Sequence, residues 1–88
     1  ASYALLLCIF GEILNLKPKR FIHSFGDAHI YLNSIEQVKE QISREPKPLP
    51  TLRIPKLNSF EDIKNCKVDD FILENYDHHP PIKAKMAV

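Results

Sequence analysis

The 88-residue sequence has few of the features that mark disulfide-bonded, membrane-spanning or nucleic-acid-binding proteins. Its two cysteines, Cys8 and Cys66, are too few for a disulfide framework, and neither has a second cysteine at metal-ligand spacing. We therefore expect a reducing, cytoplasmic setting. The apolar run over 1–10 is far shorter than the roughly 20 residues that span a bilayer, and Glu12 interrupts its continuation.

Charge of one sign is also scarce in any one place, since 12 basic and 11 acidic residues leave a net charge of +1. The densest basic group is 17–20, and no aromatic residues are interleaved with it to stack on bases. It predicts a solvated turn rather than a nucleic-acid footprint. A chain of this length buries only about 60% of its unfolded surface, so we expect one unit that needs a partner or further chain for stability.

Two helices are expected from the apolar pattern. Residues 2–16 are apolar on nearly every helical face, which predicts an enclosed helix that Pro18 ends. This chain is too small to enclose such a helix alone. A one-sided amphipathic helix is predicted over 34–45, with Ser34 as its N-cap and Gln37 at the reciprocal capping-box position.

Short extended elements are expected in the second half. Alternating prolines force an extended connection over 46–50, and 51–54 is a strand candidate. Asn58 or Ser59 can cap a short helical turn through Glu61 or Asp62, and 71–76 has the apolar and aromatic content of a last strand. Helices and mixed strands together predict an α+β fold.

The sharpest polar pattern is Asp27-x-His29-x-Tyr31, within a strand candidate over 20–32. Because side chains alternate along a strand, these three groups share one face, and Ile30 would face the core. A carboxylate, an imidazole and a phenol can orient a hydroxylated ligand. An ordinary polar strand face packed under a loop is the competing interpretation.

Other candidate sites are weaker. His78 and His79 could be combined with His23 and Asp77 into a metal site, but adjacent histidines in an extended tail point in different directions. We expect a solvated loop there and no metal. Cys8 has no base near it in the sequence, so a small core residue is expected rather than a nucleophile.

Five stretches then follow one another in a recognisable order: Ala1-Ser-Tyr-Ala-Leu-Leu, Phe21-Ile-His, Gly26-Asp-Ala-His-Ile-Tyr31, Ser43-Arg-Glu-Pro-Lys-Pro-Leu-Pro50 and Ile82-Lys-Ala-Lys-Met-Ala-Val88. Together they resemble thymidylate synthase. The likeness runs over essentially all of 1–88 but covers only the carboxy-terminal segment of the single domain of a family member. Asn75 departs from the family, since many members have Gly there, and Phe25 stands where a smaller residue is frequent.

The resemblance implies reductive methylation of dUMP to dTMP by a homodimer, with 5,10-methylenetetrahydrofolate as co-substrate. His29 and Tyr31 match residues that hydrogen-bond the deoxyribose 3′-hydroxyl, and Ile30 between them contributes position. The family's closing tail, which covers the folate, matches 77–88 and ends in Met86-Ala-Val88.

No catalytic residue of the family falls within these 88 residues. Its Pro-Cys-His nucleophile motif precedes the matched segment, and neither Cys8 nor Cys66 corresponds to it. The 88-residue chain is therefore expected to be inactive without the amino-terminal part of the enzyme. The alternative is a non-catalytic nucleotide-binding or interaction fragment of a truncated or split gene product.

Overall fold

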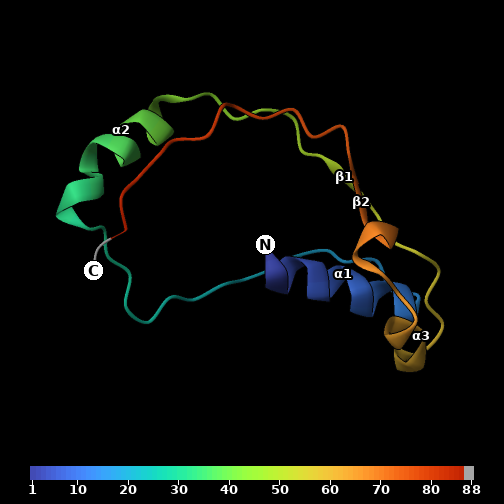
Figure 1. Ribbon diagram of the computed structural model, residues 1–88. Coiled ribbons are helices and arrows are strands. Elements are labelled where there is room, and N and C mark those ends of the chain that lie inside the picture. The colour runs from blue at the N-terminus through green and yellow to red at the C-terminus, as the bar shows by residue number, and fades with distance from the viewer. Residues whose placement is uncertain (87–88) are drawn as a thin grey trace.

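Helix α1 spans Ser2–Leu14 in the computed structural model, which describes residues 1–86 (Figure 1). Its end is set locally rather than by the proline that follows. Asn15 takes a left-handed φ of 53°, and the N–H of Leu16 donates to the Gly11 carbonyl at 2.8 Å. The N–H of Asn15 donates to the Glu12 carbonyl at 3.3 Å, which completes a Schellman motif. This motif satisfies the last carbonyls, so the helix ends before the predicted boundary at residue 16.

The sheet is a two-stranded antiparallel pair formed by β1, Thr51–Arg53, and β2, Ile72–Glu74. Leu52 lies opposite Leu73 in the register. Both strands fall inside the predicted segments, and with the helices they confirm the α+β class. Asn75 follows β2 with a φ of 56°, a left-handed conformation that Gly and Asn adopt most readily.

The predicted strand over 20–32 does not form. Residues 20–31 run as an extended segment with a bend at Gly26 and Asp27, and the segment leads into a 3₁₀ turn, η1, Leu32–Ser34. A strand needs a neighbour to pair with its N–H and C=O groups. The strands within residues 1–86 pair with each other and leave this segment without one.

Helix α2 spans Ile35–Ser43 directly after η1. Ser34 occupies the predicted N-cap position, but its side chain makes no capping hydrogen bond. Gln37, its expected partner, instead donates from Nε2 to the Lys83 carbonyl at 3.4 Å. The predicted capping box is therefore wrong, because the returning tail lies where Gln37 can reach it.

The second predicted cap does form. Helix α3 spans Phe60–Lys64, and Asp62 Oδ2 accepts hydrogen bonds from the N–H of Asn58 at 2.8 Å and of Ser59 at 3.2 Å. These bonds satisfy donors that a helix start otherwise leaves free. A 3₁₀ turn, η2, Val68–Asp70, then leads into the last strand.

The core is very small. Leu57, 2% exposed, is the one buried apolar side chain among the described residues, and α1 has none. The radius of gyration is 16.9 Å, whereas a closed domain of this length would have about 12 Å. Figure 1 shows α1 and α3 at one end, α2 at the other, and extended segments joining them. This open arrangement confirms that the segment does not enclose its first helix.

Candidate functional site

His29 lies on the extended segment beside Asp27. Its Nδ1–H donates to Asp27 Oδ1 at 3.1 Å, since an ionised carboxylate can only accept. This bond leaves Nε2 of a neutral imidazole as an acceptor. The His29 side chain is 53% exposed, so this second nitrogen is open to a ligand.

Tyr31 adds a second polar group next to it. The rings of His29 and Tyr31 meet edge to face, with centroids 5.3 Å apart and planes at 63°. Tyr31 is 55% exposed, and a phenol can both donate and accept a hydrogen bond. The predicted grouping of Asp27, His29 and Tyr31 is therefore confirmed, and backbone alternation produces it without a sheet.

Ile30 does not face a core as predicted. It is exposed, because nothing within residues 1–86 packs beneath this part of the extended segment. Ile30 lies between His29 and Tyr31 in the sequence, and its expected contribution to the position of the nucleotide site stays a prediction.

A row of aromatic rings precedes the polar group, at every second residue of the same extended segment. The ring of His23 stacks on Phe25 with centroids 4.2 Å apart and planes at 23°, and it lies 5.9 Å from the ring of Phe21. His23 therefore packs with aromatic neighbours. Within the described residues, no group of three or more His, Cys, Asp or Glu side chains is arranged to hold a metal ion.

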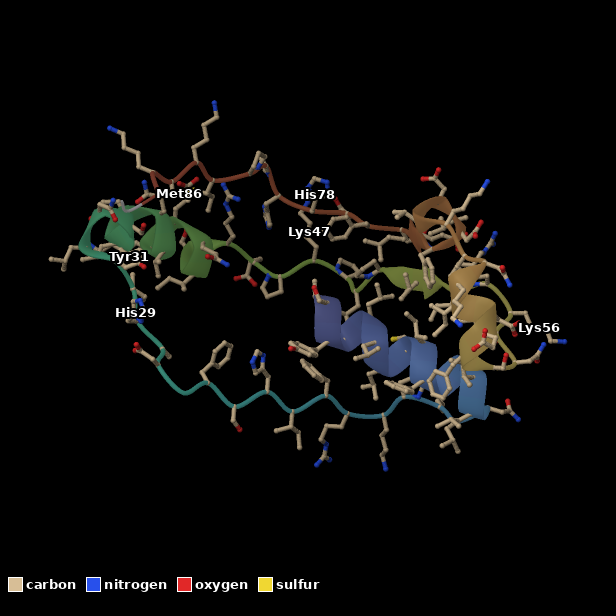
Figure 2. All side chains as sticks on the ribbon, turned by 60° about the horizontal axis from the view of Figure 1, so that its bottom comes forward. His29, Tyr31, Lys47, Lys56, His78 and Met86 are labelled. Carbon is tan, nitrogen blue, oxygen red and sulfur yellow. The ribbon has the colours of Figure 1, made fainter. Side chains whose placement is uncertain are left out.

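The tail after β2 returns along α2 and the proline-rich connection (Figures 1 and 2). Lys47 Nζ lies 3.2 Å from Asp77 Oδ1, and His79 Nε2–H donates to the Glu45 carbonyl at 2.8 Å. The loop was predicted to be solvated, and Asp77 and His78 are exposed. The half-buried His79 ring ties the tail to the segment that follows α2.

Arg44 makes the shortest of these tail contacts. Its Nη1–H donates to the Pro80 carbonyl at 2.6 Å, and its Nη2–H donates to Glu40 Oε1 at 2.8 Å. No sequence signal indicates the bond to Pro80, since the two residues are 36 positions apart. Glu40 and Arg44 form an ion pair at i, i+4 spacing, with Arg44 at the carboxyl-terminal cap of α2.

The described part of the tail reaches the end of the molecule that carries the polar group. Figures 1 and 2 both place the end of the described tail beside the start of α2, and Figure 2 shows Met86 and Tyr31 at the same end of the molecule. Met86 is exposed there. Ala87 and Val88, the other residues of the predicted closing tail, lie outside the described residues.

Two hollows in the described part of the chain lie elsewhere. One of about 460 Å³ is lined by Cys8, Gly11, Leu52 and neighbouring residues, and a second of about 400 Å³ follows the apolar face of α1. Neither includes His29 or Tyr31. Cys8 is a half-buried free thiol, as is Cys66, whose Sγ–H donates to the Asp62 carbonyl at 3.3 Å. No helix in the described part of the chain has the length and apolarity to cross a bilayer.

Known sequences match this chain throughout its length. The family model described as Thymidylate synthase matches residues 1–88. The chain is 54% identical over 88 residues to thymidylate synthase of Homo sapiens and 50% identical over 88 residues to thymidylate synthase of Saimiriine herpesvirus 2 (strain 11). Both alignments cover 100% of the chain but only 28% and 29% of those relatives' own length.

Proposed function

Since this chain belongs to the thymidylate synthase family, we propose that residues 1–88 form the carboxy-terminal segment of a thymidylate synthase domain. The complete enzyme converts dUMP to dTMP, and 5,10-methylenetetrahydrofolate supplies the one-carbon unit and then a hydride. The observation that carries this proposal is the pairing of His29 and Tyr31, whose exposed polar atoms suit a sugar hydroxyl.

The role of this pair is to orient the nucleotide. With Nδ1 of His29 bonded to Asp27, Nε2 accepts a hydrogen bond from the 3′-hydroxyl, and the Tyr31 hydroxyl donates to the same oxygen. Two contacts on one oxygen fix both the position and the rotation of the deoxyribose. Fixing the sugar places the pyrimidine ring for attack by a nucleophile held elsewhere in the enzyme.

The tail, 77–88, acts as a lid over the folate. Met86, Ala87 and Val88 supply small and apolar groups that exclude water from the reacting carbon, which protects the one-carbon intermediate. The return of the tail to the end of the molecule that carries Tyr31 supports this role.

The remaining parts come from outside this segment. The nucleophilic cysteine belongs to an amino-terminal part of the enzyme, which also covers the exposed apolar surface of α1, and two copies of the enzyme form a homodimer in the cytoplasm. The open shape of the segment and the lack of buried residues on α1 support a dependence on further chain. No metal is required in this scheme.

The test compares tritium release from dUMP labelled at C5 by the full-length protein and by the purified 88-residue segment. The full-length protein should release tritium only when methylenetetrahydrofolate is present, because release follows addition of the one-carbon unit. The segment should release none, because covalent attack on the pyrimidine ring needs a thiolate and neither Cys8 nor Cys66 corresponds to the family's nucleophile. Folate-dependent release by the segment, or none by the full-length protein, would overturn the proposal.

A further inference from the structure

Arg44 connects the carboxyl end of α2 to the tail, and we propose that it is a positioning residue for tail closure. Arg44 fixes the Pro80 carbonyl at the carboxyl end of α2. It thereby sets the direction in which the following tail residues run along α2 toward the nucleotide. This inference rests on the proposed role of the tail as a lid. It adds that the lid starts at Pro80, where Arg44 holds the backbone.

The geometry requires an arginine. Two different guanidinium nitrogens are used at once, Nη1 on the Pro80 carbonyl at 2.6 Å and Nη2 on Glu40 Oε1 at 2.8 Å. Glu40 lies one helical turn earlier, so it holds the planar guanidinium in one orientation. A lysine has a single charged nitrogen on a flexible stem and cannot reproduce this fork. The Arg44 side chain is only 22% exposed, which limits screening by water and salt.

The position of Pro80 explains why one carbonyl can direct the tail. Pro80 and Pro81 both have a fixed φ, so the backbone around the anchored carbonyl has little freedom. On the upstream side, His79 bonds to the Glu45 carbonyl at 2.8 Å. On the downstream side, the Lys83 carbonyl accepts a longer hydrogen bond, 3.4 Å, from Gln37. The short hydrogen bonds to the tail therefore end at Pro80, which makes Pro80 the place from which we infer that the lid starts.

The consequence is a specific kinetic pattern. Closure follows nucleotide binding, so weakening the anchor should reduce kcat and leave the KM for dUMP unchanged. Loss of a charge-assisted hydrogen bond of this kind corresponds to a fall in kcat of roughly tenfold. A defect confined to protein stability would instead lower the amount of active enzyme and leave tail mobility as it was.

The experiment uses the full-length protein with Arg44→Ala, Arg44→Lys and Lys39→Ala. Lys39 is the matched control, because it is a cation on α2 that pairs with Glu36 at 3.0 Å and bonds to no residue of the described part of the tail, 77–86. Two quantities are measured: kcat and KM for dUMP, and hydrogen exchange of 82–86 with dUMP and a non-reactive folate analogue bound. Both Arg44 variants should show lower kcat and faster exchange in the tail, whereas Lys39→Ala should match the wild type.

The results for the Arg44 variants either support or refute the role of Arg44 as an anchor of the tail. Values of kcat and tail exchange in Arg44→Ala equal to those in Lys39→Ala would refute the anchor. If Arg44→Ala does not fold, Arg44→Lys is the test variant. It keeps the charge and the aliphatic stem but loses the two-nitrogen contact with the Pro80 carbonyl and Glu40. Wild-type kcat and tail exchange in Arg44→Lys would then refute the proposal. A wild-type protein that cannot convert dUMP at all would refute the proposed function, while exchange measured without ligands would still report on the anchor.

Discussion

His29 and Tyr31 hold their rings edge to face, 5.3 Å apart, on a segment that belongs to no sheet. Their proximity comes from backbone alternation, which places every second side chain on one side of an extended chain. The bond from His29 to Asp27 then selects the tautomer that leaves Nε2 as an acceptor. Two polar groups that suit a hydroxyl therefore lie side by side within five residues of sequence.

Removing either group of this pair should weaken use of the nucleotide. In the full-length protein, His29→Ala and Tyr31→Phe should each cost about 1–2 kcal/mol in kcat/KM for dUMP, because one sugar hydrogen bond is lost. The change should fall mainly on KM. Steady-state kinetics at varied dUMP concentration measure it. His23→Ala is the control, since His23 stacks on Phe25 in the same segment and should leave KM unchanged. Unaltered KM values in both site variants would remove the assigned role of this pair.

Shortening the tail should separate turnover from binding. Deleting Val88, or Ala87 and Val88, should lower kcat strongly while dUMP affinity stays nearly intact, because a lid acts after the nucleotide has bound. Calorimetric titration with dUMP and steady-state turnover are compared on the same preparations. Met86→Leu, which conserves volume and apolar character, should stay close to wild type in both. Turnover that survives both deletions would show that the tail is not a lid.

Gly11 should resist substitution even though it lies inside a helix. A Cβ at this position would lie 2.8 Å from the Leu16 carbonyl oxygen and 2.8 Å from Pro18 Cγ, atoms held by the Schellman turn and by a ring. Gly11→Ala should therefore lower the free energy of unfolding by about 1 kcal/mol, although Ala favours helices by about as much. Urea denaturation of the full-length protein measures this. Gly26→Ala is the control, because no atom lies within 4 Å of its added Cβ, and it should be neutral or slightly stabilising. Equal effects of the two substitutions would contradict the crowding at Gly11.

The cap of α3 should matter more than the ion pair beside it. Asp62→Ala removes the acceptor for two backbone N–H groups and should cost about 1 kcal/mol in the free energy of unfolding. Glu61→Ala removes an exposed contact with Lys64 at 2.9 Å and should change that free energy by less than about 0.5 kcal/mol. The difference in denaturation midpoint between the two variants is the measurement. A larger loss at Glu61 would mean that Asp62 does not cap this helix.

Local sequence rules account for much of the fold. The positions of β1 and β2, the cap by Asp62 and the grouping of His29 with Tyr31 follow from residues a few positions apart or from simple alternation, whereas the pairing of β1 with β2 joins residues distant in sequence. The strand over 20–32 fails for the opposite reason, since pairing depends on a neighbour that local pattern does not supply.

The tail contacts show the same limit within the site. Arg44 with Pro80 and Gln37 with Lys83 join residues 36 and 46 positions apart. In both bonds the acceptor is a backbone carbonyl, which every residue carries, so side-chain identity gives no information about the partner. The sequence therefore indicates a tail, but only the structure shows which residues the tail contacts.

The most direct measurement is a crystal structure of the full-length protein with dUMP bound. The account predicts that the 3′-oxygen of the deoxyribose lies within hydrogen-bonding distance, about 2.6–3.2 Å, of both His29 Nε2 and the Tyr31 hydroxyl. A nucleotide whose 3′-oxygen contacts neither group would contradict the assignment of this segment to the sugar site.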